Sequence, residues 1–225
     1  MRCASDFFTP DEKARIEAAV AEAEGQTSAE IVPVVATASG RYDRAEDIAG
    51  LWCAMILMGL VWWWLPRTEG GGYMWGLAWG RFELPALIAA SVAGFLVGAV
   101  MATRLHGLRH LFTPRTEMRE EVLGRARQAF FDNRVHRTAD ATGLLVYISV
   151  YERMAAVVAD DGVTEKLGQP VMDGLCEQLV SGIKKGDAAD ALCGVIRDAG
   201  EQLGAALPRA EDDVNELPNH LVVVD

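Results

Sequence analysis

Two long apolar segments interrupt a chain that otherwise mixes polar and hydrophobic residues at short intervals. They run from Ile48 to Leu65 and from Leu84 to Thr103, and neither contains Asp, Glu, Lys or Arg. With 1.5 Å of rise per residue, helices of this length span about 27 to 30 Å, which matches the hydrocarbon thickness of a bilayer. The pattern predicts a transmembrane hairpin of two helices, with two core helices of a soluble protein as the alternative.

Aromatic and small residues in these segments also fit a membrane hairpin. Aromatic side chains crowd its predicted turn, as they do at membrane interfaces: Trp62, Trp63, Trp64, Tyr73, Trp75 and Trp79. Small residues at four-residue spacing would let the two helices approach closely: Ala90, Gly94 and Gly98 in one segment, Gly50 and Ala54 in the other. Because neither segment carries an ionisable residue, we expect an anchor and not an ion or proton path.

Charges beside the two segments predict their orientation. Six arginines lie in the outer flanks, namely Arg41, Arg44, Arg104, Arg109, Arg115 and Arg119. The turn carries only Arg67 and Arg81. Since basic residues stay on the cytoplasmic side, both termini are expected in the cytoplasm. The start of the chain is charged and polar, which argues against a secretory signal peptide.

The segment before the hairpin, residues 1–47, predicts one helix and one strand. Thr9-Pro10-Asp11-Glu12 forms a capping box that opens a helix with a stripe of Ile16, Ala19, Val20 and Ala23, and Gly25 ends this helix. Residues 30–36 read as a strand, and Pro33 places it at or near a sheet edge because proline has no N–H. The segment is too short to bury a core, so we expect it to complete the domain behind the hairpin.

Residues 104–208 predict the remainder of that domain, and residues 209–225 an acidic tail. A helix ends near Asp132 with Leu123, Ala126 and Phe130 on one face, and an apolar, central strand covers 143–150. The short link to the next strand, 154–159, requires antiparallel pairing. Two helices follow, at 164–184 and 188–206. The predicted fold class is α/β, a small mixed β-sheet sandwiched by helices and interrupted by the transmembrane hairpin.

Composition and missing motifs narrow the classes of function. The net charge is −11, and residues 160–225 hold 14 acidic and five basic side chains, which would repel a nucleic-acid backbone. The sequence contains no phosphate-binding GxxxxGK[ST], no GxSxG, no HExxH and no CxxxxxR or DxDxT phosphatase signature. Its cysteines form no ligand-spaced pair, and Cys176 and Cys193 are expected to pack as small apolar residues in a reducing compartment.

Several stretches resemble the TPM domain, which occurs in thylakoid photosystem-repair proteins, in a modulator of acetylcholine receptors and in many bacterial membrane proteins. They are 136–138, 143–149, Glu152-Arg153 and 160–163, with 27–32 similar to that domain's opening strand and 215–219 to a tail of bacterial members that carry a membrane hairpin. The resemblance implies a TPM-like sheet between helices. Together with the hairpin and its flanking charges, it leads us to expect a bacterial inner (plasma) membrane location. For plant members of the family, phosphatase activity and divalent-ion binding have been suggested. Many members carry a signal peptide, and their domain lies outside the cytoplasm. This chain departs from that pattern.

Asp160 and Asp161 are the candidate metal ligands. They follow a predicted strand, where loop carboxylates could bind Ca²⁺ or Mg²⁺. The alternative is a turn in which Gly162 takes a positive φ and the aspartates cap the next helix. Asp132 and Asp140 could converge on the same sheet edge or simply be solvated loop residues.

Glu152, Arg153 and His136 are the candidate contacts for a partner or a phosphate. Glu152 and Arg153 lie at the predicted tip between two strands, where they could form a surface ion pair. Alternatively, the planar guanidinium of Arg153 could bind a phosphate or a partner carboxylate. His106 and His110, beside arginines, are expected to contact anionic lipid.

The sequence therefore predicts a membrane-anchored TPM-like domain protein that acts as a protein-interaction or membrane-protein quality-control and repair module. Its expected partners are the lipid bilayer and other membrane proteins. A divalent-metal-dependent phosphatase is the alternative, and a purely structural membrane component is the third interpretation. The sequence leaves open whether the protein is an enzyme, which partner it binds and what its oligomeric state is.

Overall fold

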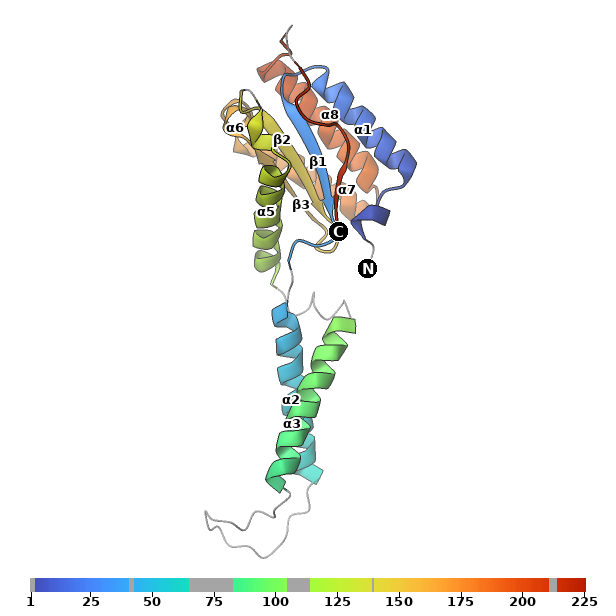
Figure 1. Cartoon of the computed structure of the whole chain (residues 1–225), viewed down its shortest axis with the longest axis vertical. Coiled ribbons are helices and arrows are strands. Elements are labelled where there is room, and N and C mark those ends of the chain that lie inside the picture. The colour runs from blue at the N-terminus through green and yellow to red at the C-terminus, as the bar shows by residue number, and fades with distance from the viewer. Residues whose placement is uncertain (1–2, 41–42, 65–82, 105–113, 139, 211–213) are drawn as a thin grey trace, which may run out of the picture. The chain divides into compact units, whose positions relative to one another are not determined.

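The computed structural model describes residues 3–40, 43–64, 83–104, 114–138, 140–210 and 214–225 (Figure 1). The chain forms two compact units. One combines residues 1–40 with residues 116–225, and the other comprises residues 41–115. The first unit is therefore discontinuous in sequence, because the second is inserted between its first strand and the helix α5 (Arg115–Asp132).

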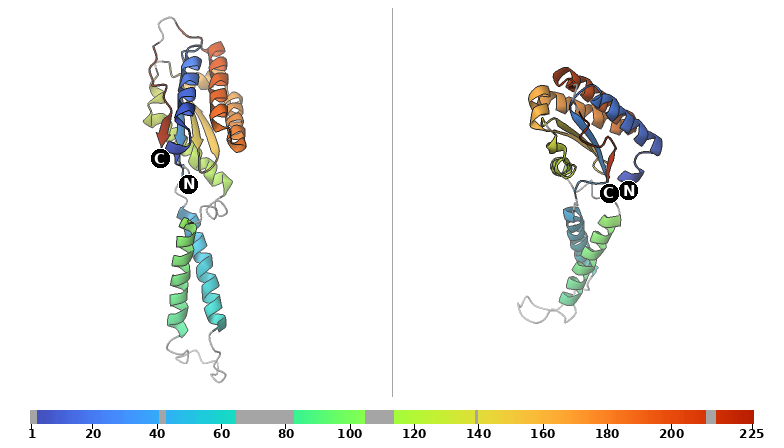
Figure 2. Two further views of the ribbon diagram at one scale, coloured as in Figure 1. Left: turned by 90° about the vertical axis from the view of Figure 1, so that its right-hand side faces the viewer. Right: turned by 45° about the horizontal axis from the view of Figure 1, so that its top comes forward.

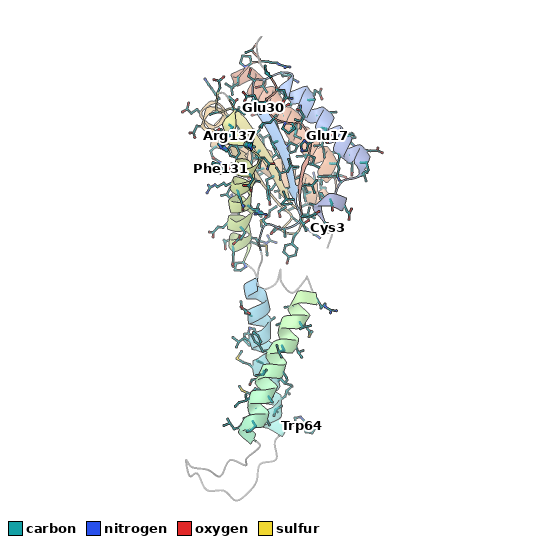
Figure 3. The ribbon with its side chains drawn as sticks, viewed as in Figure 1. Cys3, Glu17, Glu30, Trp64, Phe131 and Arg137 are labelled. Atoms are coloured by element: carbon teal, nitrogen blue, oxygen red, sulfur yellow. The ribbon has the colours of Figure 1, made fainter. Side chains whose placement is uncertain are left out.

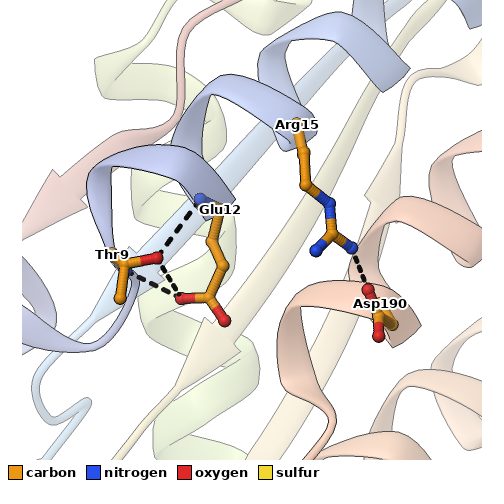
Figure 4. Close-up of polar contacts among 4 residues, drawn as sticks. All are labelled: Thr9, Glu12, Arg15 and Asp190. Atoms are coloured by element: carbon orange, nitrogen blue, oxygen red, sulfur yellow. Dashed lines mark hydrogen bonds and ion pairs between the residues drawn. The ribbon is translucent and has the colours of Figure 1, made fainter.

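Helix α1 (Pro10–Glu24) follows the short 3-10 helix η1 (Ala4–Asp6) and begins where the sequence predicts it. The Thr9 hydroxyl accepts a hydrogen bond from the Glu12 backbone N–H at 3.3 Å, and the Glu12 carboxylate accepts one from the Thr9 N–H at 2.8 Å (Figure 4). The predicted apolar stripe is buried. Arg15 forms an ion pair with Asp190 of helix α8 (Ala188–Ala206).

A four-stranded mixed sheet forms the centre of the first unit, which confirms the predicted α/β class. Its strands are β1 (Glu30–Ala36), β2 (Gly143–Ser149), β3 (Met154–Ala159) and β4 (Val222–Val224), in the order β3-β2-β1-β4. β1 runs parallel to β2 and β4, whereas β2 and β3 pair antiparallel as predicted. β2 is an interior strand, as its apolar sequence predicts.

The prediction that Pro33 lies at or near a sheet edge is only partly right. β1 is an interior strand, because β4 adds to it on the side away from β2. However, β4 pairs only with Val34–Ala36, so Pro33 faces no strand on that side. The missing N–H of Pro33 therefore costs no ladder hydrogen bond there.

Helices cover both faces of the sheet (Figures 1 and 2). On one face lie α1, α8, α7 (Gln169–Lys185) and the short α6 (Asp161–Leu167), which enclose the larger core. On the other face α5 packs Val122, Ala126 and Phe130 against β1 and β2. Burial on both faces explains why these strands are apolar throughout, without an alternating polar side.

Two predicted details of the helices are wrong. The helix expected at 164–184 is two helices, α6 and α7, because Gly168 adopts φ +76° and ψ 160° and Pro170 lies in the first turn of the second helix. On α5, Leu123 is exposed, and Val122 takes the buried place expected for it.

Cys193 lies in the core as predicted, and burial raises the pKa of its thiol.

The second unit is a helical hairpin of α2 (Asp43–Trp64) and α3 (Glu83–Arg104). Both helices are long and apolar enough to span a membrane. Only 17% of the apolar segment Asp47–Trp64 and 17% of the apolar segment Leu84–Ala102 are buried. As predicted, small residues mediate their contact: a Cβ at Gly98 would lie 2.7 Å from the Ala49 carbonyl oxygen, and one at Gly94 would lie 2.8 Å from the Ala54 Cα. The predicted aromatic turn at Tyr73, Trp75 and Trp79 lies outside the described residues.

Candidate functional site

The predicted site residues lie at opposite ends of β2. Glu152 and Arg153 belong to the turn that follows β2, whereas His136 precedes β2 and Asp160-Asp161 follow the far end of β3. A strand of seven residues spans about 23 Å. These residues therefore form two separate groups, and a single small ligand cannot contact both.

Glu152 is the centre of a buried polar network. Only 5% of the residue is exposed. Its Oε1 accepts hydrogen bonds from the backbone N–H groups of Ser39 at 2.9 Å and of Gly40 at 3.3 Å, and its Oε2 accepts one from the Ser149 hydroxyl. The Ser39 hydroxyl donates to the Ser149 Oγ at 2.9 Å and lies 3.1 Å from the Tyr147 hydroxyl.

This network fixes the exit from β1. Ser39 and Gly40 follow β1 and end the first unit, beyond which the chain continues into the second unit. Burial raises the pKa of the Tyr147 hydroxyl, which keeps it neutral and able to donate to Ser39. The carboxylate of Glu152 thus acts as an acceptor for backbone and serine donors.

Arg153 does not form the surface ion pair that is one interpretation of the sequence. Its side chain is exposed, and among the described residues its guanidinium has neither an ion-pair nor a hydrogen-bond partner. Its backbone adopts φ +52°, a conformation that costs a residue with a Cβ more than it costs glycine. The guanidinium of Arg153 is therefore available to an external group.

Asp160 and Asp161 begin helix α6. Asp160 is the N-cap, and its Oδ1 accepts a hydrogen bond from the Asp161 N–H at 2.9 Å. This is the capping role that the sequence offers as the alternative to metal binding. Gly162 is helical and lacks the expected positive φ; instead, a Cβ there would lie 2.6 Å from the Ala141 carbonyl oxygen. In the described part of the chain, no three His, Cys, Asp or Glu side chains converge as a metal site would require.

His136 belongs to the 3-10 helix η2 (Val135–Arg137) and lies beside two aromatic side chains of α5. Its ring centroid is 5.0 Å from that of Phe131 and 6.5 Å from that of Phe130. Its Nδ1 is buried without a hydrogen-bond partner among the described residues. Phe131 is 61% exposed, a large apolar side chain on the surface of α5 (Figure 3).

Two buried glutamates that the sequence analysis did not single out hold the C-terminal segment. Glu30 accepts hydrogen bonds from the backbone N–H groups of Glu216 at 3.0 Å and Leu217 at 3.3 Å. Glu24, only 8% exposed, accepts from the Ile31 N–H at 3.0 Å and from the Asn219 side-chain amide at 2.5 Å. Burial, with a contribution from the charge of Glu30, raises the pKa of Glu24 to about 7.

The sequence contained a weak signal for this second cluster. Glu30 is a charged residue at the start of an otherwise apolar strand, and residues 215–219 resemble a tail of hairpin-bearing TPM proteins. Glu24 and Asn219 are 195 residues apart, so no local pattern predicts their contact.

Comparison with known proteins supports the fold. No protein-family model matches the chain, and no curated protein sequence matches it. The chain is similar to the NMR structure of the BA42 protein from the psychrophilic bacterium Bizionia argentinensis, with a TM-score of 0.55 and 18% sequence identity. The match covers 96% of this chain and 94% of that chain. At this identity it shows a shared fold.

Proposed function

We propose that the protein is a membrane-anchored TPM-like domain protein that binds other membrane proteins, as an interaction or quality-control and repair module. The observation that carries the proposal is the apolar surface of the inserted hairpin. Only 17% of the apolar segment of each helix, α2 and α3, is buried, and Trp64 is 82% exposed. An apolar surface of this extent needs lipid or protein to cover it.

The way in which the hairpin joins the α/β unit also supports an anchor. The hairpin interrupts that unit after Gly40, where the Glu152 carboxylate holds the two backbone N–H groups. An exit held by charge-assisted hydrogen bonds restrains the point at which the chain leaves the unit. With Arg104, Arg115 and Arg119 among the flanking charges, we place both termini in the cytoplasm of a bacterial cell, with the hairpin in the inner (plasma) membrane.

Binding is preferred to catalysis because of what the candidate residues do. Asp160 caps a helix through its Oδ1, and Glu152 accepts hydrogen bonds from backbone and serine groups, so both carboxylates have a structural role. Asp161 is exposed, but among the described residues it does not belong to a group of three or more metal-ligating side chains. Exposed Phe131 and Arg153 are instead groups that interfaces use, since aromatic and arginine side chains are enriched there. A divalent-metal-dependent phosphatase is the alternative that the TPM resemblance implies.

Two experiments test the proposal. Alkaline carbonate washing of membranes should leave the full-length protein in the pellet, and its recovery in the supernatant would contradict the anchor. A photo-reactive phenylalanine analogue at Phe131 should cross-link to integral membrane proteins in intact membranes. The same analogue at exposed Glu17 on α1 serves as the control. Equal cross-linking at both positions, or metal-dependent phosphatase activity in the purified protein without any cross-link, would refute the binding module.

A further inference from the structure

Strand β3 is an open edge of the sheet. It pairs with β2 on one side, and no other strand among the described residues pairs with it on the other. Its sequence, Met154 to Ala159, contains no proline and no charged residue, and three of its six side chains are alanine. Natural edge strands usually carry proline or charged residues, which prevent pairing with another chain. β3 therefore lacks protection by its own sequence, and α7 contacts it through the Cys176 thiol.

The hydrogen-bond pattern identifies which backbone groups of β3 point outward. Asp160 N–H donates to the Gly143 carbonyl at 2.9 Å, and the register pairs these two residues directly. Because such pairs alternate along an antiparallel ladder, the N–H and C=O groups of Ala155, Val157 and Ala159 point away from β2. In agreement, the Ala155 carbonyl accepts a bond from the Cys176 thiol of α7 at 3.1 Å. A thiol is a weak donor, and a carbonyl oxygen has two lone pairs.

We propose that two copies of this chain associate through β3, antiparallel, with Val157 opposite Val157 of the second copy. In this register Ala155 faces Ala159 of the second copy, so all three outward residues pair and about six backbone hydrogen bonds form. A slip by one residue would turn the apolar side chains of each strand to the wrong face. A two-fold axis perpendicular to the sheet keeps both faces continuous and closes the assembly at two copies.

Charge supports a second copy of the chain as the occupant. Arg153 lies in the turn just before β3 and Asp161 is the first residue of α6, just after β3, so the same register brings Arg153 near Asp161 of the second copy. The two-fold axis repeats this approach at the other end. Both side chains are exposed, and neither has an ion-pair or hydrogen-bond partner among the described residues. Arg119 of α5 and the acidic Asp173 and Glu177 of α7 lie close enough to act on the Cys176 thiol, so both signs of charge flank the edge.

A charge exchange tests the pairing in the full-length protein in detergent micelles. Light scattering with the detergent mass subtracted should give the mass of two chains for the unaltered protein. Arg153→Asp or Asp161→Lys places like charges opposite each other and should weaken the dimer at least about tenfold. The double variant restores opposite charges and should restore the dimer. Arg127→Asp, an exposed position on α5, makes the same charge change elsewhere and should leave the mass unaltered.

Amide hydrogen exchange shows whether β3 itself forms the contact. The amides of Ala155, Val157 and Ala159 should exchange slowly in the dimer and rapidly in either single variant, while the amides paired with β2 stay protected in all forms. Aspartate tolerates a positive φ, so Arg153→Asp is compatible with the fold. A monomer at all concentrations, single variants that remain dimeric, a double variant that stays monomeric, or fast exchange of the three edge amides in the dimer would each overturn the proposal.

Discussion

At the scale of single residues, Glu24 makes the stability of the α/β unit depend on pH below neutrality. Its pKa is raised from 4.5 to about 7 in the folded protein, mainly by burial. Between these two values the folded state binds more protons than the unfolded state, so the free energy of unfolding falls as pH rises from about 4.5 to about 7. Above that range this carboxyl contributes no further change.

Glu24→Gln should remove this contribution, because glutamine keeps an acceptor and a donor but cannot ionise. Denaturant titrations of the full-length protein in detergent, made at several values between about pH 5 and about pH 8, measure how the free energy of unfolding changes with pH. Glu17→Gln, on the exposed side of α1, is the control and should keep the unaltered slope. A Glu24→Gln variant that is as pH-dependent as the parent would show that another group is responsible.

Glu152 makes a second prediction at this scale. Glu152→Ala leaves the N–H groups of Ser39 and Gly40 and the Ser149 hydroxyl without their carboxylate, in a buried place. We expect a loss of about 2 to 4 kcal/mol in the free energy of unfolding, since these donors lose bonds to a charged group. Glu152→Gln keeps the Oε1 acceptor and should lose less. Equal losses would mean that packing, and not the hydrogen bonds, is what Glu152 supplies.

At the scale of elements, the α2–α3 contact depends on glycines that leave no room for a side chain. Gly98→Val would force atoms against the Ala49 carbonyl and the Gly50 Cα, and should destabilise the hairpin by about 1 to 3 kcal/mol. Gly59→Val adds the same side chain to α2 where nothing lies within 4 Å and should be nearly neutral. Thermal unfolding in detergent compares them, and matching melting temperatures would show that the two helices do not pack as described.

Local patterns predicted the elements but not the partners of their ends. The α1 capping box and the β1, β2 and β3 strands depend on residues close in sequence, so pattern alone located them. The break at Gly168 was missed because glycine is tolerated within helices, and its φ is a tertiary outcome. Val122 and Leu123 are adjacent apolar residues, and only the angle at which α5 packs decides which one is buried.

The candidate site shows the same division. Glu152 and Arg153 were identified from a local resemblance, but Ser39, which donates to Glu152, is 113 residues away in sequence. The separation of Glu24 from Asn219 is greater still. Such contacts are made only when the sheet brings β1 beside β2 and the C-terminal segment beside β1. A single sequence carries no periodicity that reports them.

At the scale of the whole molecule, the α/β unit should fold without the hairpin that interrupts it. Its core clusters contain only residues of the first unit, and β1 pairs with β2 across the insertion over all seven of its residues. Replacing residues 41–115 by a flexible Gly/Ser linker should therefore give a soluble protein with one cooperative unfolding transition. Loop closure costs grow slowly with length, so the linker itself changes stability little.

Removing residues 1–40 from that linked protein should have the opposite effect. The deletion takes away α1, which packs on α8, and β1, which lies between β2 and β4, so apolar surface and one edge of β2 become exposed. Aggregation during size-exclusion chromatography and the loss of the cooperative transition are the expected results. A truncated protein as stable and monodisperse as the linked one would show that residues 116–225 form a complete domain, and that the first forty residues only rest on it.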